Sequence, residues 1–235
     1  MKNMANRLSP LERITIEIPS LRNISVKSLM LVFIPAIIIL VAIEMISQIY
    51  QVPIKKLTSD PALIANIPPL YGVLSNLGIV LWCGAIFSSA LAAMVLRSIG
   101  KKQLYLFLLY SSLLSAYLML DDLFQFHENL SSVIGLNQKV VYIFLGAAVI
   151  TYIIYFRKTL FQTNIILLVI AIAFLSLSVL ADTIVYKIYG SQLGDWLYLI
   201  EDGAKWLGIV FWSYYFFYTS IQFILKNTEA PSSAN

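Results

Sequence analysis

Six long apolar runs constrain the fold of this chain more than any other feature. They cover residues 29–50, 72–97, 103–126, 138–156, 163–188 and 197–225. A helix that crosses the roughly 30 Å hydrocarbon core of a bilayer needs about 20 predominantly apolar residues, and each run comes close to or exceeds that length. Only 12% of the 235 residues are charged, whereas soluble domains carry about 25%. The sequence therefore predicts an all-α integral membrane protein with six transmembrane helices.

Lysine and arginine are distributed unevenly between the two sides of these runs. Five of the sixteen fall on one side, at Lys55, Lys56, Lys139, Lys187 and Lys205. The other eleven flank both termini and the 98–102 and 157–162 loops. Because cytoplasmic loops are enriched in Lys and Arg, both termini are expected in the cytoplasm. The net charge of +4 thus follows a topology pattern, and no nucleic-acid partner is expected.

The segments outside the apolar runs have distinct patterns. Residues 1–28 are interpreted as a cytoplasmic tail, 29–226 as the six-helix transmembrane domain and 227–235 as a disordered cytoplasmic tail. Ser9-Pro10-Leu11-Glu12 has the form of a capping box and precedes apolar residues at near-helical spacing. This pattern favours a short interfacial helix, although the alternating isoleucines at 14, 16 and 18 would also suit a strand. In the 51–71 connection, Asp60-Pro61 predicts the start of a short helix.

Acidic residues show the opposite asymmetry. Three lie on the cytoplasmic side, at Glu12, Glu17 and Glu229. The other nine lie on the outer side or in the outer half of a run, and they are Glu44, Asp60, Asp121, Asp122, Glu128, Asp182, Asp195, Glu201 and Asp202. Acidic residues contribute little to topology, and an ionisable residue within a span is by default a candidate functional residue. We therefore predict a carboxylate-rich polar site at the extracytoplasmic side, with Asn76 near the same depth.

The densest acidic stretch runs from Asp121 to Glu128. It places three carboxylates and the only histidine of the chain, His127, within eight residues. At about 100° per residue, Asp121, Gln125 and Glu128 share one helix face, whereas His127 lies on another. The histidine joins the Asp121 face only if the helix ends near Phe126.

The last apolar run begins with a second charged stretch. Glu201 and Lys205 are four residues apart, which is a favourable spacing for an ion pair on one helix. Between them, Gly203 would allow another helix to approach closely.

One hypothesis is a metal-dependent enzyme. The proposed ligands are Asp121, His127, Glu128, Asp182, Glu201, Glu44 and Asp202, an oxygen-rich set that suits Fe, Mn, Mg or Ca better than zinc. Such ions activate water or oxygen, and the candidate catalytic residues are Asp121, Asp122, Glu128, Asp182 and Glu201. The substrate would be a membrane lipid or another hydrophobic small molecule. The sequence leaves open whether the protein is an enzyme.

Three other interpretations remain open. The carboxylates would be solvated helix ends, or Glu44, Asp182 and Lys205 would form a proton or cation pathway of a transporter. Alternatively, the acidic outer surface would dock a basic partner, in which case the protein is a non-catalytic subunit or assembly factor.

Two stretches carry a resemblance. Asp121 to Glu128 reads D-D-x-F-x-x-H-E, and Glu201 to Ile209 reads E-D-G-x-K-x-x-G-I. In these stretches the chain resembles a group of uncharacterised bacterial, often cyanobacterial, multi-pass membrane proteins. The resemblance implies a multi-pass protein of a bacterial inner membrane or a thylakoid membrane, and no particular activity.

Overall fold

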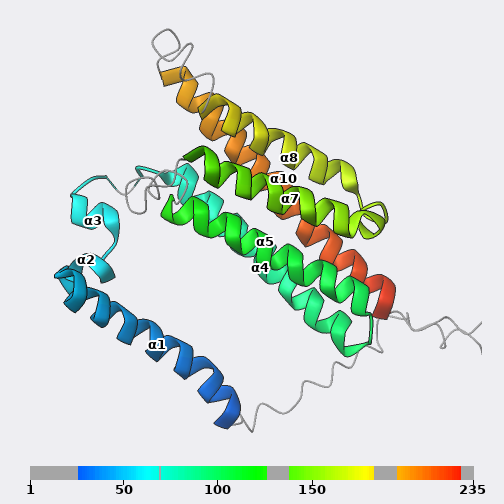
Figure 1. The fold of residues 1–235 in the computed structure, drawn as a ribbon, viewed down its shortest axis with the longest axis horizontal. Coiled ribbons are helices and arrows are strands. Elements are labelled where there is room, and N and C mark those ends of the chain that lie inside the picture. The colour runs from blue at the N-terminus through cyan, green and yellow to red at the C-terminus, as the bar shows by residue number, and fades with distance from the viewer. Residues whose placement is uncertain (1–25, 69, 126–137, 183–194, 229–235) are drawn as a thin grey trace, which may run out of the picture. The chain divides into compact units, whose positions relative to one another are not determined.

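The structure is a computed structural model that describes residues 26–68, 70–125, 138–182 and 195–228. Within these ranges every regular element is a helix (Figure 1). The chain divides into two units, residues 1–71 and 72–235, and each unit is described by itself. The amino-terminal and carboxy-terminal tails predicted from the sequence lie largely outside the described residues.

The first unit holds one long helix and two short ones. Helix α1 spans Val26–Tyr50, contains Pro35, and exposes nearly all of its described apolar side chains. Helices α2 (Ile54–Thr58) and α3 (Pro61–Ala65) follow it. The Asp60 side chain accepts hydrogen bonds from the Ala62 and Leu63 amides at 2.8 and 3.3 Å, with Pro61 in the first turn. The helix start predicted at Asp60-Pro61 is therefore confirmed.

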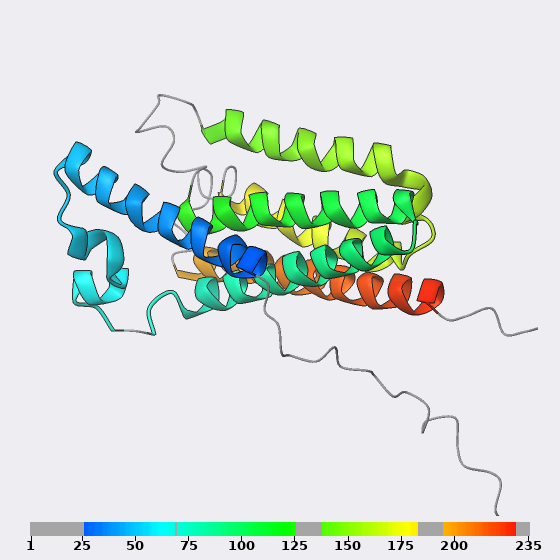
Figure 2. The same cartoon turned by 90° about the horizontal axis from the view of Figure 1, so that it is seen from below.

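The second unit is a bundle of helices that run side by side (Figures 1 and 2). Its described helices are α4 (Val73–Ser98), α5 (Lys102–Phe124), α7 (Gln138–Leu160), α8 (Ile165–Leu180) and α10 (Asp195–Thr228). Helix α5 packs between α4 and α7, and α10 packs against α4 and α8, with a smaller contact to α5. The packing order across the bundle is therefore α7, α5, α4, α10, α8.

Small side chains allow α4 to pack against two neighbours. Its buried positions include Gly78, Ala85, Ser89, Ala92 and Ala93, spaced mainly three or four residues apart along the helix. Small residues at this spacing let helix backbones approach closely in a membrane. Hydroxyl groups add interhelical bonds, since the α5 and α10 serines at 112 and 213 donate to carbonyl oxygens of α4 at 3.0 and 2.9 Å.

Aromatic packing attaches α7 to the bundle. The fully buried ring of Phe107 on α5 lies 5.9 Å from the ring of Tyr152 and 5.5 Å from that of Phe156, both on α7. The same ring lies 6.0 Å from that of Phe223 on α10. Offset and edge-to-face contacts of this kind contribute about 0.5–1.5 kcal/mol beyond the burial of their area. This cluster forms the core in the half of the bundle that contains the 98–102 connection.

Among the described helices, five are long and apolar enough to cross a membrane, namely α1, α4, α5, α7 and α10. The membrane class and the all-helical fold predicted from the sequence are thus supported. Helix α8 has 16 described residues and is shorter than a span requires. The predicted run of 163–188 continues beyond Asp182 into residues that lie outside the described part, so the sixth span remains a prediction.

Charges separate to the two ends of this bundle. Near the 98–102 and 160–165 connections lie the basic residues Arg97, Lys101, Lys102, Arg157, Lys158 and Lys226. All described acidic residues of the unit belong to the opposite ends of the helices, where α5 and α8 end and α10 begins. The bundle therefore has a basic end and an acidic end.

Candidate functional site

A cavity of about 730 Å³ lies between the helices at the acidic end of the bundle. Helices α4, α5, α7, α8 and α10 all contribute to its lining. The charged and amide groups of the lining are Asp121, Asp122, Gln125, Asp182, Glu201, Asp202 and Lys205. Five carboxylates and one ammonium therefore line a single space between the helices of the bundle.

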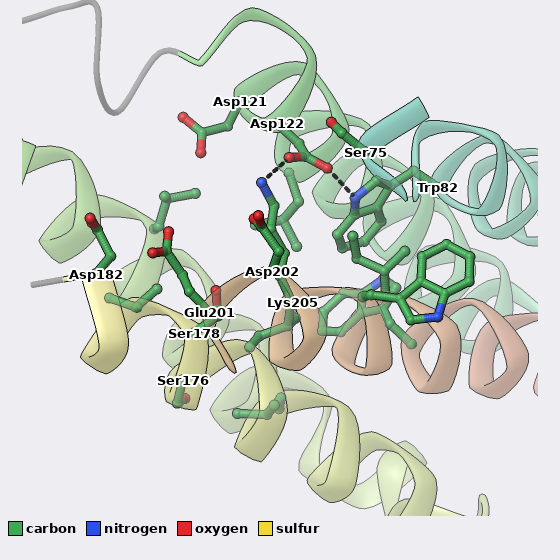
Figure 3. Close-up of a pocket in the computed structure, with 18 of the residues that line it drawn as sticks. Ser75, Trp82, Asp121, Asp122, Ser176, Ser178, Asp182, Glu201, Asp202 and Lys205 are labelled. Carbon is green, nitrogen blue, oxygen red and sulfur yellow. Dashed lines mark hydrogen bonds and ion pairs between the residues drawn. The ribbon is translucent and has the colours of Figure 1, made fainter. Parts of the chain in front are cut away.

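Asp122 lies at the centre of the polar contacts. Its Oδ1 forms an ion pair with Nζ of Lys205 on α10, and its Oδ2 accepts a hydrogen bond from Nε1 of Trp82 on α4 at 3.3 Å (Figure 3). The Asp122 side chain is only 5% exposed, whereas that of Lys205 is 35% exposed. One carboxylate thus connects three helices, and the ion pair compensates part of its desolvation.

Other carboxylates surround this pair from separate helices. Asp121 is buried in the last turn of α5, while Glu201 and the exposed Asp202 belong to the second turn of α10. Asp182 follows α8 in a π-helical turn that begins at Ala181. Figure 3 shows Asp121, Asp182 and Glu201 on neighbouring elements around the same space. Such widened turns are frequent at functional sites because they redirect side chains.

Away from the carboxylates the cavity is apolar. Leu118, Val149, Ile172, Leu175 and Ile209 line it together with several other aliphatic residues. Three of the four tryptophans of the chain also line it, at Trp82, Trp206 and Trp212. The rings of Trp82 and Trp212 meet edge to face at 5.8 Å, and Nε1 of Trp212 donates to Oγ of Ser115 at 2.9 Å. The indoles of Trp82 and Trp212 are therefore held in place. The cavity combines a charged rim with apolar walls.

The sequence predicted that His127 could join the Asp121 face only if the helix ended near Phe126. Helix α5 does end in this region. The last helical residue is Phe124, and Gln125 adopts a left-handed conformation with φ of 51°. Its amide bonds to the carbonyl of Asp121 and closes the helix. The helical face predicted for Asp121 and Gln125 is therefore wrong at Gln125, because the helix ends one residue before it. His127 and Glu128 themselves lie outside the described residues.

The structure brings most of the predicted site residues together. Asp121, Asp122, Asp182, Glu201 and Asp202 line the cavity. Glu44 belongs to α1 in the first unit, where its exposed side chain accepts a hydrogen bond from Gln48 at 2.9 Å. Among the residues that the structure describes, no group of three or more His, Cys, Asp or Glu is arranged to hold a metal ion. The metal hypothesis therefore depends on His127, Glu128 or a rearrangement.

Two local expectations about α10 need correction. Lys205, expected to pair with Glu201 on its own helix, forms its ion pair with Asp122 of α5. Gly203, expected at a close helix contact, has open space around an added Cβ as far as the described residues extend. The close approach is instead at Gly208, where an added Cβ would lie 2.7 Å from Cγ of Leu175 on α8. The spacing of residues along α10 does not reveal which neighbouring helix each face of α10 contacts.

Sequence reasoning missed the tryptophans and one serine. Asn76 was expected near the site but is exposed, and Ser75 beside it lines the cavity instead. Trp82, Trp206 and Trp212 were not singled out. These tryptophans lie inside apolar runs, away from the span ends where interfacial tryptophans gather. That position could have marked them as candidates for the lining of an internal site.

The fold and the cavity define the class: a helical membrane protein with an acidic cavity between its helices. A family model described as "Domain of unknown function (DUF8692)" matches residues 30–219, which is more than half of the chain. The chain therefore belongs to this family. Comparisons with curated proteins and with solved structures gave no match.

Proposed function

We propose that this multi-pass membrane protein binds a lipid or another hydrophobic small molecule in the cavity, with the carboxylates at the extracytoplasmic side contacting the polar group of the ligand. The observation that carries the proposal is one cavity of about 730 Å³ with apolar walls and a rim of carboxylates. Ligand sites typically measure about 300–1,000 Å³ and pair apolar walls with a few placed polar groups. The cavity satisfies both conditions.

The charge distribution supports the extracytoplasmic placement of the cavity. The basic end of the bundle carries Arg97, Lys101, Lys102, Arg157, Lys158 and Lys226. Basic residues near span ends favour the cytoplasmic side. The cavity then faces the outside of the cell or the lumen, and a ligand reaches it from the outer leaflet.

Tryptophan fluorescence provides a direct test, because Trp82, Trp206 and Trp212 line the cavity. The protein in lipid nanodiscs is titrated with a lysophosphatidylcholine whose acyl chain carries two bromines, which quench indoles on contact. We expect saturable quenching. Val149→Phe, which fills the α7 wall of the cavity, should weaken it several-fold.

The matched control is Ile143→Phe, a similar enlargement on the same helix at a side chain that is 69% exposed and lies outside the cavity lining. It should leave the titration unchanged. Quenching that rises linearly with lipid content and is equal in all three proteins would reflect bilayer contact alone and would contradict the proposal.

A metal-dependent reaction is a second candidate function. The early end of α5 at Phe124 supports it, because Gln125 leaves the helical conformation and α5 therefore does not fix the phase of His127 and Glu128. Asp121, Asp182 and Glu201 of the cavity would complete the ligands for Fe, Mn, Mg or Ca. The metal would activate water or oxygen toward the bound hydrophobic substrate.

Elemental analysis of the purified protein tests this candidate. We expect stoichiometric metal in the wild type and in Asp60→Asn, which changes a carboxylate of the first unit. The double variant Asp121→Asn, Asp182→Asn should lose the metal. Equal metal content in wild type and double variant would rule the candidate out.

A further inference from the structure

We infer that a second binding site lies between α5 and α7 at the basic end of the bundle, and that it holds the head group of an anionic phospholipid. The structure has a groove of about 420 Å³ at this place. Its lining consists of Lys102, Gln103 and Leu106 of α5 with Tyr155 and Phe156 of α7. The groove and the cavity at the acidic end share no described lining residue, so the two sites are separate.

Aromatic rings form the apolar part of the groove. Phe156 is only 5% exposed, and its ring lies 5.5 Å from that of Phe107 and 5.8 Å from that of Tyr110, both on α5. The ring of Tyr155 meets the ring of Phe156 edge to face at 4.7 Å, and Tyr155 is 71% exposed. The groove therefore has a buried aromatic floor and an aromatic wall on the exposed surface of α7.

Polar groups lie at the end of the groove nearest the helix termini. Lys102 is the first residue of α5 and is exposed. Beside it, Nε2 of Gln103 donates to Oγ1 of Thr159 on α7 at 3.4 Å, so these two residues lie at the same level of the bundle. Leu106 and Tyr155 lie about one turn further from the basic end. The groove thus changes from charged to apolar in the order in which a phospholipid changes from head group to acyl chains.

Charge complementarity selects an anionic head group. Lys101 precedes Lys102, and Lys158 follows Tyr155 by three residues, which places it one turn nearer the basic end on nearly the same face of α7. In the part of the bundle that the structure describes, no carboxylate lies at this end. Basic pockets between transmembrane helices bind anionic lipid head groups. Lysine suits this role because its stem covers apolar surface while its ammonium stays at the interface.

The shape of the groove favours a lipid over a free phosphate ion. A free ion would use only the polar end at Lys102 and Gln103 and would leave the apolar floor and wall uncovered. A phospholipid covers both parts, because its phosphate reaches Lys102 while an acyl chain packs along Leu106 and Tyr155. The occupant is therefore a phospholipid from the leaflet at the basic end.

Native mass spectrometry of the 235-residue chain in detergent tests the inference, because it counts the lipids bound to each molecule. Phosphatidylglycerol and phosphatidylcholine with identical acyl chains are titrated separately. We expect the first phosphatidylglycerol to bind with a dissociation constant about fivefold lower than that of phosphatidylcholine, the factor expected from one interfacial lysine. An excess of inorganic phosphate should not displace the bound lipid, because phosphate lacks the acyl chains.

A matched pair of charge-neutral variants locates the site. Lys102→Gln should remove most of the preference for phosphatidylglycerol. Lys226→Gln removes the same charge from the basic end, but on α10 and outside the groove lining, and should keep the preference. Tyr155→Ala should weaken the binding of both lipids, whereas Tyr214→Ala, at a side chain of α10 that is 54% exposed, should affect neither. Circular dichroism checks that each variant is folded.

Three outcomes would overturn the inference. Equal dissociation constants for the two lipids in the wild type would contradict the anionic head group. An equal loss of preference in Lys102→Gln and Lys226→Gln would show that the diffuse charge of the basic end attracts the lipid, without a site in the groove. Displacement of the lipid by inorganic phosphate would contradict the phospholipid as the occupant.

Discussion

At the scale of single residues, Asp122 has a role that its neighbour Asp121 does not share. Both were candidates from sequence because both end the same apolar run. The ion pair to Lys205 and the hydrogen bond from Trp82 depend on residues 83 and 40 positions away in the chain. The sequence could identify the carboxylate as costly to bury, but its partners follow only from the arrangement of three helices.

Neutralising one member of this pair should destabilise the bundle. We expect Asp122→Asn to lower the free energy of unfolding by about 1–3 kcal/mol, because Lys205 then faces the cavity without its partner. The range is set below that of a fully buried pair because the Lys205 side chain is 35% exposed and partly screened by solvent. Unfolding by SDS titration in mixed micelles measures the change.

A double variant provides the control for this prediction. Asp122→Asn combined with Lys205→Gln removes both charges, so its stability should exceed that of Asp122→Asn alone. If instead the losses from the two single variants simply add, the residues do not interact, and the ion pair has no energetic role.

At the scale of helices, α10 organises the second unit. It is 34 residues long, packs against α4, α8 and α5, and carries Lys205 toward the cavity. Its packing against α8 depends on Gly208, where a Cβ would come within 3.0 Å of the backbone nitrogen of Leu175. Hydropathy was sufficient to place the helix, with predicted bounds of 197–225 close to the observed ones. It could not show which glycine meets a neighbour.

Two glycines of α10 therefore make a matched pair for mutation. Gly208→Ala should destabilise the protein by about 1–3 kcal/mol, because the added methyl group overpacks against α8. Gly203→Ala should be neutral or stabilising by up to about 1 kcal/mol, since alanine favours the helix and open space surrounds the position. Thermal unfolding in detergent compares them, and equal midpoints for the two variants would contradict the close contact at Gly208.

Helix ends were predicted less well than helix positions. Apolar runs can be counted, but the end of α5 at Phe124 depends on Gln125 taking a left-handed conformation. Glutamine has no special preference for that region, so its sequence carries no signal for the break. The helical phase predicted for Gln125 was wrong for this reason. The start of α3 was predicted correctly because Asp-Pro is a specific capping signal.

At the scale of the whole molecule, the separation of charge defines an orientation. The basic end of the bundle predicts the cytoplasmic side, and accessibility to a membrane-impermeant maleimide tests it. Cys83 is the only cysteine, so Cys83→Ser provides a background without reactive thiols. In that background Ser98→Cys should be labelled only after the cells are permeabilised.

Thr58→Cys is the counterpart in the 51–71 connection, which the sequence places on the outer side. It should be labelled in intact cells. The reverse pattern would invert the topology and place the cavity on the cytoplasmic side. Labelling of both positions in intact cells would argue that α4, which lies between them, does not cross the membrane.

The membrane class and the acidic end were predictable because both depend on composition along the chain. The cavity was not, since its lining combines residues of five helices that are far apart in the sequence. Glu44 shows why composition along the chain is not sufficient. Its depth in an apolar run predicted that it belongs to the same acidic site, but membership of the site depends on the position of α1 relative to the bundle.

The ion pair between Asp122 and Lys205 joins two charged stretches, one at the end of α5 and one near the start of α10. These stretches lie about a third of the chain apart in sequence and meet in the bundle. Substitutions at these two positions should therefore be correlated. A family member that lacks the acid at 122 is expected to lack the lysine at 205 as well, because an unpaired charge would otherwise remain between the helices. Aligned sequences of the family would then show correlated changes at positions 122 and 205, while exposed positions such as Asp202 vary independently of both.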